Sequence, residues 1–188
     1  TDIKRLKSVF LLTDLHRSTY FIAFQEEPAK LFFLGCDYNV GHRTAGAFLI
    51  DGRTATLVTA ASDGCLRLLD FNPMNPTSHG GQRLLVRTEY HASGTVSASL
   101  ILRHSYSAEG EPAASEVLLA KENGAIDMLV PVRERTFHLL QLLQSMLVRS
   151  IRHTAGLNPR AFRAVPNEHV SRPLTKGILD GCLLHSAE

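Results

Sequence analysis

The sequence predicts a mainly β protein, in which antiparallel blades of a β-propeller are followed by a short α-helical C-terminal segment. Short β-type runs separated by turn residues extend from Lys7 to about Val132, with too little chain between them for helices. Two hairpins of one design lie sixty residues apart, as in a propeller built from four-stranded meanders. After Pro131 the spacing of apolar residues becomes helical. We therefore expect propeller blades over 1–132 and a helical segment over 133–188.

The first expected hairpin covers residues 9–24 and turns at the Asp-Leu-His-Arg-Ser sequence of 14–18. Residues 25–28 end in proline, which favours a turn rather than a continued strand. The chain then enters a further expected strand at 30–35.

The clearest hairpin pairs residues 55–61 with residues 65–71 across a Ser-Asp-Gly turn. Asp63 is expected to bond its own backbone there, and Gly64 to supply the positive φ that a tight turn needs. Asp63 and Asp70 flank this hairpin and could instead be interpreted as a catalytic carboxylate pair serving acid and base roles. The backbone role is favoured, because aspartate at turns usually has it.

A second hairpin of the same design pairs residues 116–121 with 125–130 across Glu-Asn-Gly, where Asn123 and Gly124 form the turn signal. Two segments rich in Pro, Gly, Ser and Asn interrupt the repeat, and both are expected to be exposed, mobile loops. They span 72–82 and 105–114.

The expected strands number about ten and make roughly two and a half blades. A closed ring needs at least four blades of four strands each. The sequence therefore predicts an incomplete ring, whose open edge would need cover from other blades or another chain.

The helical segment is expected to begin with one helix over 133–151, with an apolar stripe that contains Phe137, Leu140, Leu143, Met146 and Leu147. This helix should end near His153, because Gly156 and an Asn-Pro pair follow. A weaker second helix is expected over 174–184.

The composition is that of a globular chain with a core: 188 residues, 44% of them apolar, with a formal net charge of +2. No signal-peptide or membrane-spanning segment is recognisable, so no membrane partner is expected. The three cysteines lie far apart and are expected to be free thiols. Five aromatic residues on apolar positions are assigned to the core: Phe32, Phe33, Phe48, Phe71 and Phe137.

No motif predicts catalysis, a cofactor or a metal site. His79 to Gly81 has the His-Gly-Gly sequence of a lipase oxyanion-hole turn, but no Gly-x-Ser-x-Gly elbow accompanies it, which favours a surface loop over a small hydrolase. The nine histidines include no metal-binding pair at helical spacing, and no glycine-rich phosphate loop occurs. We expect the protein not to be an enzyme.

Basic residues outnumber acidic ones between Arg149 and Lys176, where Glu168 is the single acid. This excess favours an acidic protein or RNA as partner; the alternative is a solvated face, with Phe162 packed in the interior. The candidate interaction residues are Arg149, Arg152, Arg160, Phe162 and Arg163.

Four sequence elements carry a resemblance to a known family. The most specific is Ala-Gly-Leu-Asn-Pro-Arg-Ala-Phe-Arg at 155–163, followed by Asp-Gly at 180–181. Asp-Leu-His-Arg-Ser at 14–18 and Gly-Gly-Gln-Arg-Leu-Leu-Val-Arg at 80–87 complete the set. Together they resemble the C-terminal region of the large subunit of the cleavage and polyadenylation specificity factor.

The resemblance implies a nuclear, non-catalytic scaffold of pre-mRNA 3′-end processing. Its implied partners are zinc-finger and propeller subunits of the same complex, with RNA contacted mainly through them and a direct RNA contact left open. The alternative is a paralogous propeller scaffold, either of a DNA-repair ubiquitin ligase or of a splicing factor.

Overall fold

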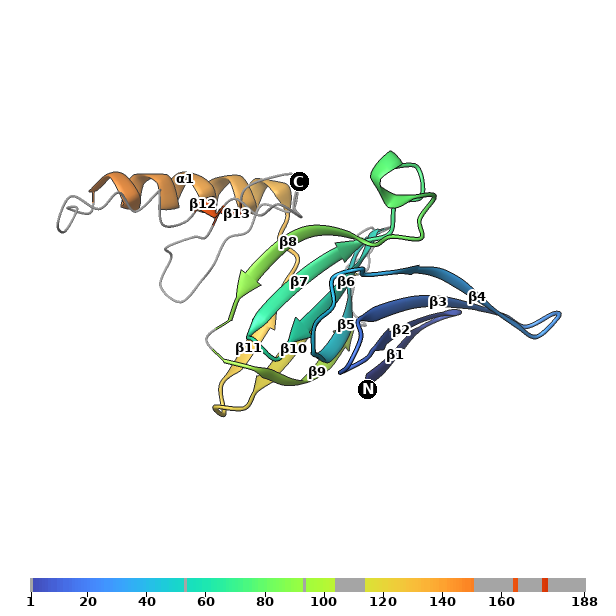
Figure 1. The fold of residues 1–188 in the computed structure, drawn as a ribbon. Coiled ribbons are helices and arrows are strands. Elements are labelled where there is room, and N and C mark those ends of the chain that lie inside the picture. Colours follow the sequence, from blue (N-terminus) through green and yellow to red (C-terminus); the bar gives the residue numbers. More distant parts are fainter. Residues whose placement is uncertain are drawn as a thin grey trace. The chain divides into compact units, whose positions relative to one another are not determined.

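A computed structural model describes residues 2–52, 54–92, 94–103, 114–150, 164–165 and 174–175. The chain forms two compact units, and the boundary between them along the sequence lies between Pro131 and Val132. Figure 1 shows the helix and strands of both units.

The first unit consists of three antiparallel sheets, each a meander of strands in chain order. Sheet 1 contains β1 (Asp2–Leu6), β2 (Val9–Thr13), β3 (Thr19–Gln25) and β4 (Lys30–Cys36). Sheet 2 contains β5 (Arg43–Asp51), β6 (Thr54–Ala61), β7 (Cys65–Asp70) and β8 (Leu85–His91). Sheet 3 contains β9 (Val96–Arg103), β10 (Ser115–Lys121) and β11 (Ile126–Leu129).

The mainly β prediction is confirmed, and so are the three expected hairpins, which are β2–β3, β6–β7 and β10–β11. The strand count differs slightly from the expected ten, because the described part of this unit has eleven strands. The extra strand is β1, which lies before the first expected strand and pairs with β2.

The core lies between the sheets in two clusters. The first joins sheets 1 and 2 through Leu11, Phe21, Phe48, Leu57, Leu69 and Leu84. The second joins sheets 2 and 3 through Ala45, Ala47, Val58, Ala60, Leu66, Val96, Val117 and Leu119. Because side chains alternate along a strand, β5 sends Phe48 into the first cluster and Ala47 into the second.

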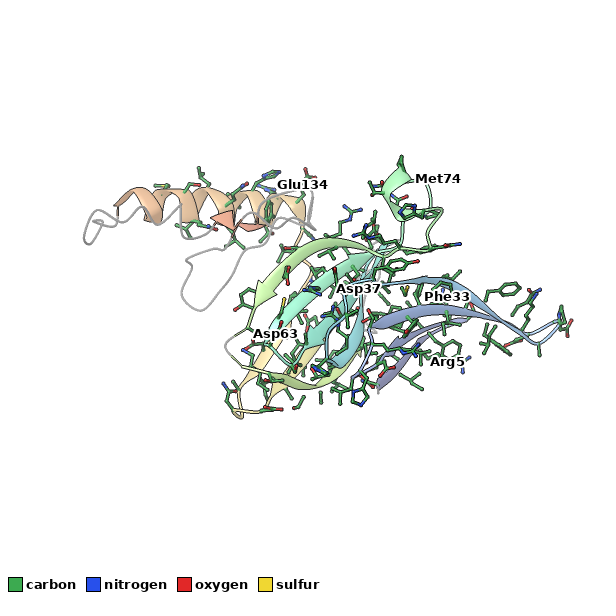
Figure 2. All side chains as sticks on the ribbon, in the orientation of Figure 1. Arg5, Phe33, Asp37, Asp63, Met74 and Glu134 are labelled. Carbon is green, nitrogen blue, oxygen red and sulfur yellow. The ribbon has the colours of Figure 1, made fainter. Side chains whose placement is uncertain are left out.

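Two aromatic residues that were assigned to the core are in fact exposed. Phe32 and Phe33 on β4 keep 39% and 53% of their surface accessible, whereas Phe48 is buried. The reason is position: β4 is the last strand of sheet 1, and its hairpin with β3 extends beyond the rest of the unit (Figures 1 and 2).

The segment 72–82 is exposed over most of its length, as expected, but Ser78 and Gly81 within it are buried. It contains a 3₁₀ turn, η1 (Pro76–Ser78), in which the Asn75 side-chain oxygen accepts a hydrogen bond from the Thr77 amide. Ser78 is fully buried, and its hydroxyl accepts a hydrogen bond from the Gly81 amide. Most of the second expected loop, 105–114, lies outside the described residues.

The second unit contains α1 (Glu134–Ser150), which confirms the expected helix as far as Ser150. It also contains β12 (Ala164–Val165), paired with β13 (Leu174–Thr175). The second helix was therefore wrong at its first two residues: Thr175 is β-branched and pairs in a strand with Ala164. The rest of that expected helix lies outside the described residues.

Candidate interaction surfaces

Most of the predicted interaction residues fall outside the described part of the second unit. Arg149 belongs to the last turn of α1, where its backbone is described. The other four, Arg152, Arg160, Phe162 and Arg163, lie outside the described residues. The role of all five residues remains a prediction.

The described surface of α1 is amphipathic. Leu139, Leu142, Leu143 and Met146 are exposed on it, and a shallow pocket lies over Glu134, Arg135, His138, Leu139 and Leu142. Residues three and four apart lie on the same side of a helix, so these apolar side chains form one stripe.

The two hairpin turns have equivalent geometry. Gly64 and Gly124 have φ of +77° and +82°, which is the left-handed region that favours glycine. The Asp63 carboxylate accepts a hydrogen bond from the Cys65 amide at 2.8 Å, and the Asn123 side-chain oxygen accepts one from the Ala125 amide at 3.0 Å. These side chains therefore hold the turns.

Asp70 and His79, which belong to the two candidate catalytic patterns, have structural roles. Asp70 pairs with Arg87, with 2.6 Å between Oδ2 and Nη2. His79 has a left-handed backbone and closes the 3₁₀ turn, since its amide donates to the Pro76 carbonyl. Among the described residues no three His, Cys, Asp or Glu side chains lie close enough together to bind a metal ion.

A buried charge network, which the sequence did not predict, joins sheets 1 and 2. It consists of Asp37, Arg43, Arg67, Glu89 and Cys65. Asp37, just after β4, accepts a hydrogen bond at 2.9 Å from Nη2 of Arg43, and both side chains are at least 98% buried. Arg67 pairs with Glu89 at 3.0 Å and lies 3.9 Å from Asp37. The Cys65 thiol donates to the same Glu89 carboxylate at 2.6 Å.

Burial controls protonation in this network. Burial and the neighbouring Glu89 together raise the pKa of the Cys65 thiol to about 12. Burial and the charge of Arg67 lower the pKa of Arg43, while Asp37 opposes that shift. Cys65 is thus a protonated hydrogen-bond donor at neutral pH, not a reactive thiolate.

The network holds the segment that links sheet 1 to sheet 2. Arg43 also donates to the Asn39 carbonyl, and the Asp37 carboxylate accepts from the Asn39 amide. The Asp37 amide donates to the Thr19 carbonyl of β3. The position of residues 37–42 is therefore fixed from both sheets, and Figure 2 shows Asp37 within the body of the unit.

Sheet 1 has an apolar outer face that no described element covers. Its other face carries Leu11 and Phe21 and packs on sheet 2. The strand register places the outer residues in rows, and every one of them is exposed or half-buried. They are Ile3, Phe10, Leu12, Tyr20, Ile22, Phe24, Leu31 and Phe33.

Sheet 3 has a similar outer face at the other end of the unit. Leu118 of β10 lies opposite Leu100 on one side and Met128 on the other. Leu100, Leu102, Ile126 and Met128 are exposed. Apolar faces this broad are uncommon on monomeric proteins and mark interaction surfaces.

A family model that describes the CPSF A subunit region matches residues 1–187. The chain belongs to the CPSF A subunit family.

Three relatives are similar to this family member over most of its length. It is 29% identical to Protein cft1 of Schizosaccharomyces pombe, over 96% of this chain and 13% of that protein. It is 35% identical to the probable cleavage and polyadenylation specificity factor subunit 1 of rice, over 97% of this chain and 13% of that protein. The Arabidopsis thaliana cleavage and polyadenylation specificity factor subunit 1 is also 35% identical, over 84% and 11%. The chain thus spans about an eighth of the length of these relatives.

The expected family resemblance is therefore confirmed. The match to the CPSF A subunit region covers both units, so the sheets and the helix belong to one family region. None of the described helices of this family member is long and apolar enough to cross a membrane.

Proposed function

We propose that this chain is a non-catalytic scaffold module of the nuclear machinery for pre-mRNA 3′-end cleavage and polyadenylation. Family membership, with relatives named for that machinery, is the observation that carries the proposal. Its partners are the zinc-finger and propeller subunits of that complex, and RNA is reached mainly through them.

The three sheets support a scaffold role through an incomplete propeller ring. The first strand of sheet 2, β5, contacts the first strands of both other sheets, β1 and β9. This matches the inner strands of neighbouring propeller blades. The uncovered faces of sheets 1 and 3 then receive further blades at the two ends of the arc, so that the ring buries them.

The helical segment supplies a basic contact surface in this proposal. Arg149, Arg152, Arg160 and Arg163 attract acidic side chains or phosphates of a partner, and Phe162 adds an apolar contact.

The test is affinity purification of the tagged protein, in its full natural length, from nuclear extract, followed by mass spectrometry. We expect polyadenylation-factor subunits to copurify. Recovery of ubiquitin-ligase or spliceosomal subunits in their place would move the assignment to a paralogous scaffold.

The Arg160→Glu, Arg163→Glu double variant should lose at least tenfold in subunit recovery, while Arg17→Glu on an exposed loop of the first unit serves as the charge control. Unchanged recovery with the double variant would contradict the role of the basic surface.

A further inference from the structure

The edge strand β4 presents an unusual run of apolar residues, Leu31 to Leu34. Leu31, Phe32 and Phe33 expose 64%, 39% and 53% of their surfaces. Proteins normally protect edge strands with charges, prolines or bulges, because an unpaired strand edge is a template for another chain. Lys30 is the charged residue of β4, and Leu31, Phe32 and Phe33, which follow it, are exposed to solvent.

The backbone edge of β4 is open along the same run. β4 is the terminal strand of sheet 1 and pairs with β3 on one side. On its other side, Cys36 forms an isolated bridge with Arg83. Among the described residues no strand pairs with β4 before Cys36.

Completion of a propeller ring would cover one face of this hairpin and leave the other face open. Phe32 lies opposite Ala23, on the face of sheet 1 that carries the buried Phe21. Sheet 2 already occupies that side, yet Phe32 remains exposed, because the end of β4 at Gly35 and Cys36 contacts residues 81–84, just before β8, and Phe32 lies farther out on the hairpin. The hairpin projects past its neighbour (Figure 1).

The hairpin tip has an excess of negative charge. Glu26 and Glu27 are exposed and form no ion pair with any described residue. The Lys30 ammonium lies 5.0 Å from the centre of the Phe32 ring, in a cation–π contact. The carboxylates of Glu26 and Glu27 are therefore exposed to solvent, while the nearby Lys30 ammonium contacts the Phe32 ring. This charge favours a partner with basic residues at this end of the hairpin.

We propose that β4 accepts an extended segment of another protein as a fifth strand of sheet 1. The added segment has an apolar residue that covers Phe32, on the face that the ring leaves open, and lysine or arginine residues that meet Glu26 and Glu27. Main-chain hydrogen bonds to the open edge provide affinity, and these side-chain contacts provide specificity. This inference holds whichever complex the protein joins.

The test uses two fluorescein-labelled peptides and the protein in its full natural length. One peptide is Lys-Lys-Val-Thr-Val-Thr-Val-Thr; the other has glutamates in place of both lysines. By fluorescence anisotropy, the basic peptide should bind at least tenfold more tightly than the acidic one. The Phe32→Lys variant and the Glu26→Lys, Glu27→Lys variant should each weaken it at least tenfold. Val40→Lys is the control and should have no effect, because Val40 is 85% exposed on another loop.

Hydrogen exchange identifies the mode of binding. Bound basic peptide should slow amide exchange within residues 30–35 by at least tenfold, because the added strand accepts their hydrogen bonds. Equal affinity for both peptides, binding that Phe32→Lys does not change, or absence of protection at 30–35 would each overturn the proposal. So would sedimentation that shows a dimer of the free protein converted to a monomer by Phe32→Lys, since a second copy would then be the occupant.

Discussion

The two junctions of the first unit join similar sheets with different chemistry. Between sheets 1 and 2, large side chains such as Phe48 and Leu69 pack beside buried charges from both sheets, with Asp37 from the end of sheet 1 and Arg43 from the start of sheet 2. Between sheets 2 and 3, the packing residues are mainly alanine and valine. The buried Lys121 near that junction pairs with Asp127 inside its own sheet.

The difference teaches how each junction is specified. Apolar packing is tolerant of small shifts, whereas a buried ion pair requires defined partners at defined distances. The junction of sheets 1 and 2 is therefore fixed at one end by charge, and that of sheets 2 and 3 by close contact of small residues. Three experiments break or sharpen this contrast.

Breaking the buried pair should have the largest effect. Arg43→Met leaves the Asp37 carboxylate buried without its main partner, so we expect the free energy of unfolding to fall by about 3–5 kcal/mol. Urea denaturation measures it. The Asp37→Leu, Arg43→Met double variant should recover most of the loss, because no unpaired charge remains. A double variant no more stable than Arg43→Met would contradict the assigned pairing.

Substitutions at two adjacent residues of β5 compare the junctions directly. Phe48→Ala should cost about 3–5 kcal/mol, because it opens a cavity between sheets 1 and 2. Ala47→Leu should cost about 1–3 kcal/mol, because it overfills the space between sheets 2 and 3. Both are read from urea denaturation at one pH. The contrast fails if Ala47→Leu is neutral, since the second junction would then have spare room.

The smallest effect should appear at mildly alkaline pH, where about 1.4 kcal/mol of stability is lost for each pH unit above the pKa of the unfolded thiol. In the folded protein the pKa of Cys65 is about 12, whereas an exposed thiol titrates near about 8.5. The unfolded chain therefore loses its proton first, so stability is complete below about pH 8.5 and declines as pH rises toward 12. The slope of unfolding free energy against pH above 8.5 should be smaller for Cys65→Ala.

At pH 8, iodoacetamide should modify Cys36 faster than Cys65, which is 1% exposed. Equal alkylation rates in the folded state would argue against the buried position of Cys65.

Local patterns were sufficient to predict the hairpins and α1. Two β-type runs, 55–61 and 65–71, lie on either side of the turn at Asp63 and Gly64, so this hairpin can be recognised from residues close together in the sequence. The same is true of the helical spacing of apolar residues after Pro131. The helix expected from residue 174 was wrong at its first two residues, because Leu174 and Thr175 pair in a strand with Val165 and Ala164. Tertiary pairing overrode a weak helical pattern.

The charge network and the exposed edge could not be predicted from one sequence. Asp37, Arg43, Arg67 and Glu89 come from separate strands or their ends, and no spacing rule relates them. Phe32 follows a strand pattern correctly, but that pattern does not say whether the strand is central or at an edge. The basic residues beyond Ser150 remain a prediction for the same reason, since their meaning depends on spatial neighbours.

Every strand pair within the three sheets joins neighbours along the chain. A growing polypeptide can therefore complete sheet 1 when Cys36 has left the ribosome, before the strands of sheet 2 have emerged from it. His91, the last residue of sheet 2, lies 55 residues later, so at ~5–20 residues per second the face with Leu11 and Phe21 waits roughly 3–11 s for its cover. During synthesis the order of the strands thus sets the interval in which this face is open to chaperones.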